Sequence, residues 1–159
     1  MALWNTIPGV ARTAAEIIMS EIGTDMSRFQ RAEALSAWAG VAPGNNESAG
    51  RQRSGRTRLG NSALKTILVQ ADHSAAHTKN TYLAAKYRRL AVRRGRKRAI
   101  MAVAHSILVI GYHLVQLDEP YQDLGADYFD RRSPEQTAHR LVQRLEHPGY
   151  QFALQSPSP

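Results

Sequence analysis

Apolar side chains recur at intervals of three and four residues along most of the sequence, and this spacing is the strongest constraint on its fold. Two sets show the pattern: Ala14, Ile17, Ile18 and Ile22, and Leu64, Ile67, Leu68 and Ala71. Residues spaced in this way share one face of a helix. The chain also holds 23 alanines, the residue with the highest helix propensity. The sequence therefore predicts an all-α, compact domain of about five to six helices.

Glycine, proline and capping residues mark where these helices are expected to begin and end. The expected segments are 14–22, 29–39, one starting near Asn61 or Ser62, one ending before Gly95, one from about 96 to 117, and one between Ser133 and Pro148. Ser133, Pro134 and Gln136 form a capping box. Within the expected helix 96–117, the stretch from Ala99 to Val115 is apolar almost all round, so we expect this helix to be the central buried one, with His105 and His113 as core histidines.

We expect a single domain over residues 1–154, followed by a disordered Ser/Pro-rich tail at 155–159. Its parts are a helix-hairpin-helix-like start at 7–40, a long Gly/Arg-rich loop at 41–60 and a helical body at 61–154. The start is suggested by Ile7, Pro8, Gly9 and Val10 ahead of an amphipathic segment. Backbone amides around Gly9 could hold a phosphate there, and a plain capping turn is the alternative.

Basic charge is concentrated in one region of the chain. The formal net charge is +8, but residues 48–117 alone hold fourteen Lys and Arg against a single acid, Asp72. Solvated helix faces normally interleave Glu with Lys and Arg, so this excess favours a polyanionic partner such as nucleic acid. The candidate nucleic-acid-binding residues are Gly9, Arg51, Arg53, Arg56, Arg58, Lys65, Lys86, Arg88, Arg89, Arg93, Arg94, Arg96, Lys97 and Arg98.

Helical periodicity disappears in the loop 41–60, which is rich in glycine, asparagine and arginine. Loops of this length in compact domains are usually functional or disordered. Ser48 and Ser54 stand among small residues with arginines nearby. Small neighbours let a phosphodiester approach the hydroxyl, and guanidinium groups stabilise charge on the phosphoryl oxygens. Many such loops have no chemistry, so the composition leaves both a catalytic serine and a plain loop open.

Several other classes of site are excluded or disfavoured. The chain has no cysteine, which rules out disulfides, a Cys nucleophile and thiolate metal sites and fits a cytoplasmic protein. His73 and His77 are spaced i, i+4 beside Asp72, but no third ligand is suitably placed, so no metal site is predicted in this chain. The apolar stretch from Ala99 to Val115 has only 17 residues and is interrupted by His105 and His113, so no membrane association is expected.

A set of short motifs runs along nearly the whole chain. They are Ile7-Pro8-Gly9-Val10, Ala37-Trp38-Ala39-Gly40-Val41-Ala42-Pro43-Gly44, Glu47-Ser48-Ala49-Gly50, Ser54-Gly55, Gly60-Asn61 and Leu124-Gly125-Ala126-Asp127-Tyr128-Phe129. In this order they resemble the C-terminal transposase domain of the bridge-RNA-guided insertion-sequence transposases. These serine recombinases pair this helical domain with an N-terminal RuvC-like domain.

The resemblance implies that Ser48 is the nucleophile that forms a phosphoserine link to DNA, with Ser54 as the alternative because Ala49 separates Ser48 from Gly50. It also implies that acids of the RuvC-like domain bind Mg²⁺ beside the serine, and that DNA and bridge RNA are bound by an oligomer. The chain itself is expected to need no cofactor. Because Met1 lies just before Pro8-Gly9, the RuvC-like domain would act in trans, and the chain alone would be inactive.

Two functions therefore remain open at the level of sequence. The first is an RNA-guided transposase domain that cuts DNA through its serine. The alternative is a nonenzymatic basic helical module that only binds nucleic acid, a remnant of such a transposase. Composition and charge fit both, and only the loop motif favours the first.

Overall fold

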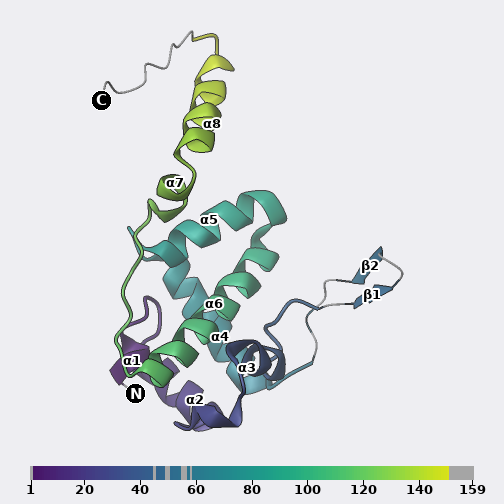
Figure 1. The fold of residues 1–159 in the computed structure, drawn as a ribbon, viewed down its shortest axis with the longest axis vertical. Helices are drawn as coiled ribbons and strands as arrows, with labels where there is room; N and C mark the ends of the chain where they lie inside the picture. Colours follow the sequence, from purple (N-terminus) through teal and green to yellow (C-terminus); the bar gives the residue numbers. More distant parts are fainter. Residues whose placement is uncertain (1, 45, 49–50, 55–56, 58, 151–159) are drawn as a thin grey trace. The chain divides into compact units, whose positions relative to one another are not determined.

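A computed structural model describes residues 2–44, 46–48, 51–54, 57 and 59–150. The chain divides into two compact units, residues 1–126 and 127–159. In the first unit the helices are α1 (Ala2–Asn5), α2 (Arg12–Ile22), the 3-10 helix η1 (Met26–Arg28), α3 (Ala32–Trp38), α4 (Ser62–His77), α5 (Tyr82–Arg94) and α6 (Arg96–Leu117). A hairpin of β1 (Asn46–Ser48) and β2 (Arg51–Ser54) lies between α3 and α4 in the sequence, as Figure 1 shows. The all-α prediction is confirmed, and the hairpin adds two short strands to the helices.

Helix α6 is the centre of the first unit. It packs against α1, α3, α4 and α5 (Figure 1). One face of α6 is buried, including Val103, Ile107, Leu108 and Tyr112. By length and composition alone α6 could cross a membrane, but its packing among four helices is that of a core helix. The predicted central position of this helix is therefore confirmed, but only one of its faces is buried.

The two histidines of α6 do not belong to the core. His105 is only half-buried and His113 is exposed, so the interpretation of both as core histidines is wrong. The apolar sequence all round the helix suggested complete burial. In the structure one face packs against α3 and α4, while the histidines lie on a face that is only partly covered.

Most predicted helix boundaries hold, because their signals are local. Asn61 caps α4 by accepting a hydrogen bond from the Leu64 backbone N–H at 2.9 Å. Two details differ. The second helix begins only at Ala32, because Phe29 ends the 3-10 turn in an extended conformation. Ser133 precedes the last helix, α8 (Pro134–Glu146), but makes no side-chain capping hydrogen bond, so the predicted capping box is wrong.

The turn at Gly9 lies directly against α4. Gly9 has φ +87°, and a Cβ atom there would be 2.4 Å from both the Ala71 carbonyl oxygen and the Ala75 nitrogen. Only glycine permits this conformation and this approach. The close contact gives Gly9 a structural role, and phosphate binding at this turn stays a prediction.

The second unit contains α7 (Tyr128–Arg132) and α8 (Pro134–Glu146). Neither helix has a buried residue among those described, and Leu141 and Leu145 on α8 are exposed. Ion pairs link Arg131 to Asp127 at 2.9 Å and Arg140 to Asp130 at 3.3 Å. The proposed tail at 155–159 lies outside the described residues.

Candidate functional site

The long loop between α3 and α4, here called the serine arm (residues 41–59), is held closed at its base. A Cβ atom on Gly60 would lie 2.4 Å from the Gly40 nitrogen and 2.5 Å from the Ala39 carbonyl carbon. Gly40 itself has φ +72°. The two ends of the arm can meet this closely because Gly60 has no Cβ, and glycine at position 40 readily adopts the positive φ. The closed base thus explains why glycine stands at positions 40 and 60, both of which belong to the sequence motifs.

Backbone hydrogen bonds fix the same base to the helices. The backbone N–H groups of Val41 and Ala42 both donate to the Ser36 carbonyl oxygen at 3.1 Å, and the Asn61 N–H donates to the Trp38 carbonyl oxygen at 3.3 Å. The Asn61 side chain also donates to a Glu21 carboxylate oxygen at 2.5 Å. The serine arm therefore extends from a base that hydrogen bonds fix to α2, α3 and the start of α4.

The hairpin within the arm sets the positions of the two candidate serines. Its register pairs Ser48 with Arg51, Glu47 with Gln52 and Asn46 with Ser54. Ser48 is thus the last residue of β1, and Ser54, the last residue of β2, stands at the opposite end of the hairpin. Of the predicted arginines, Arg51 and Arg53 lie on β2, whereas Arg56 and Arg58 lie outside the described residues.

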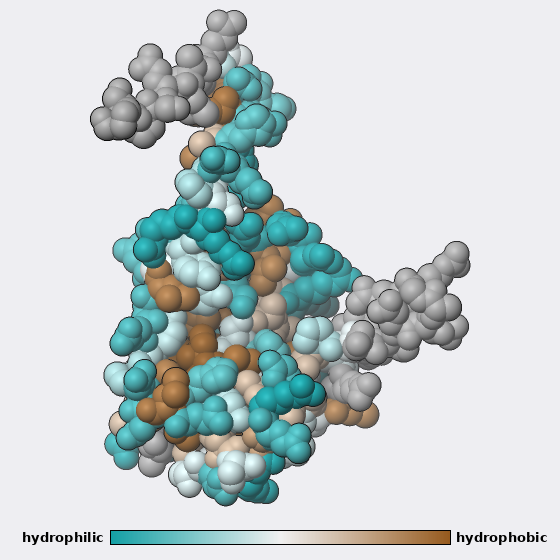
Figure 2. Space-filling model, in the orientation of Figure 1, coloured by the Kyte–Doolittle hydropathy of each residue, from teal (hydrophilic) through white to brown (hydrophobic). Residues whose placement is uncertain are grey.

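The basic residues at the junction of α5 and α6 come together on the surface. We call this set the basic corner; its members are Arg88, Arg89, Arg93, Arg94, Arg96, Lys97 and Arg98. All seven side chains are exposed, and Val92 beside them is 89% exposed. The chain reverses at Gly95, which has φ +83°. Figure 2 shows hydrophilic side chains over this part of the first unit.

Most of the corner has no internal counter-charge. Six of its members form no ion pair with any described residue: Arg88, Arg93, Arg94, Arg96, Lys97 and Arg98. Seven like charges within eleven residues repel one another, and an anionic partner would relieve that repulsion. This surface has the electrostatic character of a nucleic-acid footprint.

The remaining predicted binding residues do not join the corner. Lys65 is half-buried and donates to the Thr57 hydroxyl at 3.2 Å, near the base of the serine arm. Lys86 is half-buried between α5 and α6, where its ammonium donates to the Ser106 hydroxyl at 2.5 Å. Gly9 lies against α4. The predicted interface is therefore divided among the corner, the arm and two inner positions.

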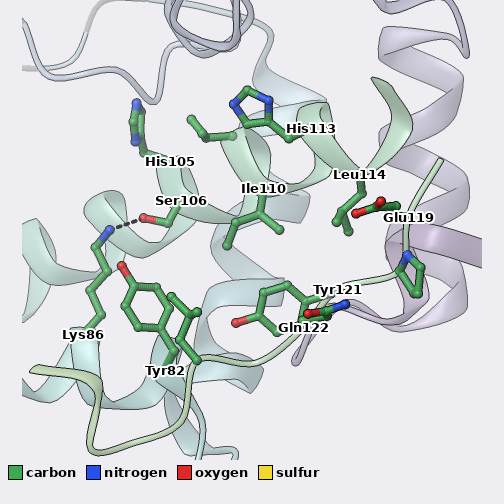
Figure 3. Close-up of a pocket in the computed structure, with 13 residues that line it drawn as sticks. Tyr82, Lys86, His105, Ser106, Ile110, His113, Leu114, Glu119, Tyr121 and Gln122 are labelled. Atoms are coloured by element: carbon green, nitrogen blue, oxygen red, sulfur yellow. Dashed lines mark hydrogen bonds between the residues drawn. The ribbon is translucent and has the colours of Figure 1, made fainter. Parts of the chain in front are cut away.

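Lys86 lines a pocket that the sequence analysis did not predict. The pocket has a volume of about 520 Å³ and lies between α5, α6 and the segment 119–124. Figure 3 shows Lys86, Ser106 and His105 at one end and Glu119 at the other. The lining residues are Tyr82, Lys86, His105, Ser106, Val109, Ile110, His113, Leu114, Glu119, Pro120, Tyr121, Gln122 and Leu124.

Burial tunes the ionisable groups of this pocket. Desolvation lowers the pKa of Lys86. Desolvation also lowers the pKa of His105, and the nearby positive charge of Lys86 adds to that effect. His105 is thereby favoured as a neutral imidazole. Desolvation and the neighbouring Asp123 carboxylate raise the pKa of Tyr121, whose hydroxyl donates to Asp123 at 3.1 Å.

The Asp123 carboxylate also holds the segment 119–124 against α5. It accepts hydrogen bonds from the backbone N–H groups of Tyr82 at 2.9 Å and Gly125 at 2.7 Å. A further bond, from the Tyr121 N–H to the Thr6 hydroxyl at 2.9 Å, ties the segment to the N-terminal turn. The pocket wall is therefore held in place by the backbone N–H of Tyr82 at the start of α5 and by the side chain of Thr6.

No metal-binding cluster is formed by the residues that the structure describes. Nowhere among them do three His, Asp or Glu side chains gather closely enough to hold an ion. His73 and His77 illustrate this, because the His77 ring nitrogen Nδ1 lies 2.6 Å from the His73 carbonyl oxygen. That contact occupies the His77 nitrogen within its own helix.

Comparison with known proteins identifies the relatives of this chain. Residues 1–88 match the model of the family described as "Transposase IS116/IS110/IS902 family". The transposase for insertion sequence element IS1111A of Coxiella burnetii (strain RSA 493 / Nine Mile phase I) is 30% identical over 121 residues, 74% of this chain and 33% of the relative. The chain thus spans about a third of that relative's length. No solved structure is significantly similar to it. Because the family model covers more than half of the 159 residues, the chain belongs to the IS116/IS110/IS902 transposase family.

Proposed function

We propose that this chain is the catalytic-serine domain of a DNA transposase, in which Ser48 attacks a DNA phosphodiester during RNA-guided transposition. The proposal rests on the geometry of the serine arm in a chain of the transposase family. Its base is closed by the contact between Gly40 and Gly60, and its hairpin sets Ser48 at the end of β1, in register with Arg51. Ser48 is preferred over Ser54, which stands at the other end of the hairpin.

The proposed step exchanges one phosphate ester for another. The Ser48 hydroxyl loses its proton, and its oxygen forms a bond to phosphorus. The bond from phosphorus to one sugar oxygen breaks, and that oxygen takes up a proton as a free hydroxyl. Arg51 and Arg53 supply guanidinium groups for the charge that develops on the phosphoryl oxygens. Because the DNA stays linked to the serine, the reverse step can rejoin it to a new end.

We further propose that the activity needs partners. The described residues of this chain do not form a site for Mg²⁺, so Mg²⁺ would be bound by acids of a RuvC-like domain supplied by a partner. Bridge RNA would pair with the DNA target and donor. The exposed leucines of α8, Leu141 and Leu145, favour assembly with a further protein surface, such as a second copy of the chain. Alone, the chain would not recombine DNA.

A denaturing gel tests the role of the serine. Labelled element-end DNA, bridge RNA and Mg²⁺ are incubated with the chain, with and without a separately expressed RuvC-like domain. A covalent adduct is expected only with that domain present, and only when Ser48 is intact. Ser54→Ala is the matched control and should keep the adduct. An adduct formed by Ser48→Ala would refute the assignment of the nucleophile, and an adduct formed without the RuvC-like domain would refute the need for it.

The basic corner supports a second candidate, a nonenzymatic module that only binds nucleic acid. It needs no serine chemistry, because the seven exposed cations alone can contact phosphates. If all seven did so, affinity would fall roughly 10³-fold or more between 50 and 200 mM salt as counterions are released. Salt-sensitive binding without any adduct would favour this candidate, and a flat salt response would contradict both.

A further inference from the structure

The pocket beneath the basic corner contains a cation without a counter-charge. Lys86 is half-buried, and its ammonium contacts the Ser106 hydroxyl at 2.5 Å and the face of the Tyr82 ring at 5.7 Å from the centroid. Both partners are neutral. Within the described part of the chain Lys86 forms no ion pair, and Glu119 lies at the far end of the pocket in Figure 3. Partial burial of a charge is costly unless an opposite charge compensates it. The polar end of the pocket is therefore suited to an anion.

The opposite wall of the pocket is suited to a flat apolar group. Val109, Ile110 and Leu114 of α6 line it, together with Leu124 of the segment 119–124. The ring of Tyr121 also borders the cavity, and its hydroxyl is held by Asp123 at 3.1 Å. The volume of about 520 Å³ lies in the range of sites for small organic molecules. The pocket thus offers a cation at one end and apolar and aromatic surface beside it, with Glu119 at the far end.

The pocket is also continuous with the basic corner along α5. Tyr82, Lys86, Arg89 and Arg93 are spaced i, i+4, i+7 and i+11, so they share one face of that helix. Lys86 and Arg93 are separated by about 10 Å along the helix axis. That is roughly three base-pair steps of a nucleic-acid strand. A strand held by the corner could therefore place one of its own nucleotides in the pocket.

We propose that this pocket binds one unpaired nucleotide of the bound nucleic acid, with its phosphate at Lys86 and its base on the apolar wall beside Tyr121. The inference rests on the proposed function, because the strand is brought to the pocket by the basic corner. Stacking on an aromatic ring accepts any base, so the pocket senses that a nucleotide is unpaired rather than which base it carries. It would select nucleic acid with a bulge or an opened base pair.

Fluorescence anisotropy of labelled oligonucleotides tests this selection. The two probes are a duplex with one unpaired 2-aminopurine and the same duplex fully paired, each made as DNA and as an RNA–DNA hybrid. The wild-type chain is expected to bind the probe with the unpaired base about tenfold more tightly, with a change in 2-aminopurine emission. Lys86→Met removes the charge and should bring the ratio of affinities close to one. Lys79→Met, at an exposed lysine between α4 and α5, is the matched control and should keep the ratio.

A second variant guards against misfolding of Lys86→Met. Leu124 is 46% exposed, so Leu124→Trp can fill the pocket from its surface side, and it should also abolish the preference. A ratio near one for the wild type, or an equal loss in the Lys79 and Lys86 variants, overturns the inference while leaving duplex binding by the corner intact. If the wild-type chain bound neither probe, that result would instead count against the proposed function. Adenosine monophosphate serves as a competitor: if it binds in a Lys86-dependent manner while the strands show no preference, the site takes a free nucleotide, and the strand proposal fails.

Discussion

Asp72 offers the sharpest test of the physical reasoning, because it is a buried acid without a hydrogen bond. Its side chain on α4 is fully buried, and neither carboxylate oxygen has a partner among the described residues. Desolvation raises its pKa from 3.8 to about 7, although the positive charge of His77 acts in the opposite direction. Asp72 is therefore expected to be protonated in the folded chain at mildly acidic pH and ionised in the unfolded chain.

The sign of the pH dependence follows from this difference. Below pH 4 both states hold the proton, and Asp72 costs nothing extra. Between about pH 4 and 7 only the folded state binds it, so the free energy of unfolding falls by about 1.4 kcal/mol per pH unit. The total loss is at most about 4 kcal/mol, and it is complete above pH 7.

Urea unfolding followed by circular dichroism from pH 4 to 8 measures this loss. Asp72→Asn keeps the shape of the side chain but cannot ionise, so its stability should depend less on pH, and above pH 7 it should exceed the wild type. Asp118→Asn is a suitable control, because Asp118 is exposed and in a left-handed conformation that asparagine tolerates. If wild type and Asp72→Asn show the same slope between pH 5 and 7, the assigned ionisation is wrong.

Three further predictions concern the arm, the core and the corner. Gly60→Ala should cost about 1–3 kcal/mol in urea unfolding and lower the yield of covalent adduct, because its Cβ would meet the Gly40 nitrogen at 2.4 Å; unchanged stability would contradict the closed base. Gly111→Ala should lower the melting temperature and alter Trp4 fluorescence, since its Cβ would fall 2.0 Å from the Trp4 ring; a variant with wild-type melting and emission would contradict this packing. Replacing Arg96, Lys97 and Arg98 by Gln should reduce the slope of log affinity against log salt by about three, and an unchanged slope would exclude them from phosphate contact.

The helical body could be predicted from sequence because its signals are local. Helices α2, α4, α5 and α6 each carry apolar residues at helical spacing, and α2, α4 and α5 end at glycine or begin at a capping residue. Helices α1 and α7 were not predicted, since four and five residues are too few to show a repeated spacing. The burial of α6 was overestimated for a related reason, because composition does not tell which face a neighbouring helix covers.

In the candidate site, too, the features with local sequence signals could be predicted and those made by distant segments could not. The basic corner was predictable because its seven cations lie within eleven consecutive residues. The pocket was not, because Lys86, Ser106 and Tyr121 come from three segments that only the fold brings together. The closed base of the serine arm combines both cases. Its glycines stand out in the sequence, but their contact joins residues twenty positions apart.

At the basic corner one helix ends and another begins, so its cations meet opposite ends of two helix dipoles. This arrangement indicates that the cations bind a partner and do not merely form a solvated surface. Arg93 and Arg94 end α5, where cations interact favourably with the helix dipole. Arg96, Lys97 and Arg98 begin α6, where the dipole is positive, and no acid stands in the first turn to offset them. Three cations at a helix N-terminus oppose both the dipole and one another. An anion bound there would remove both penalties at once, so a phosphate of nucleic acid would stabilise the corner as well as bind to it.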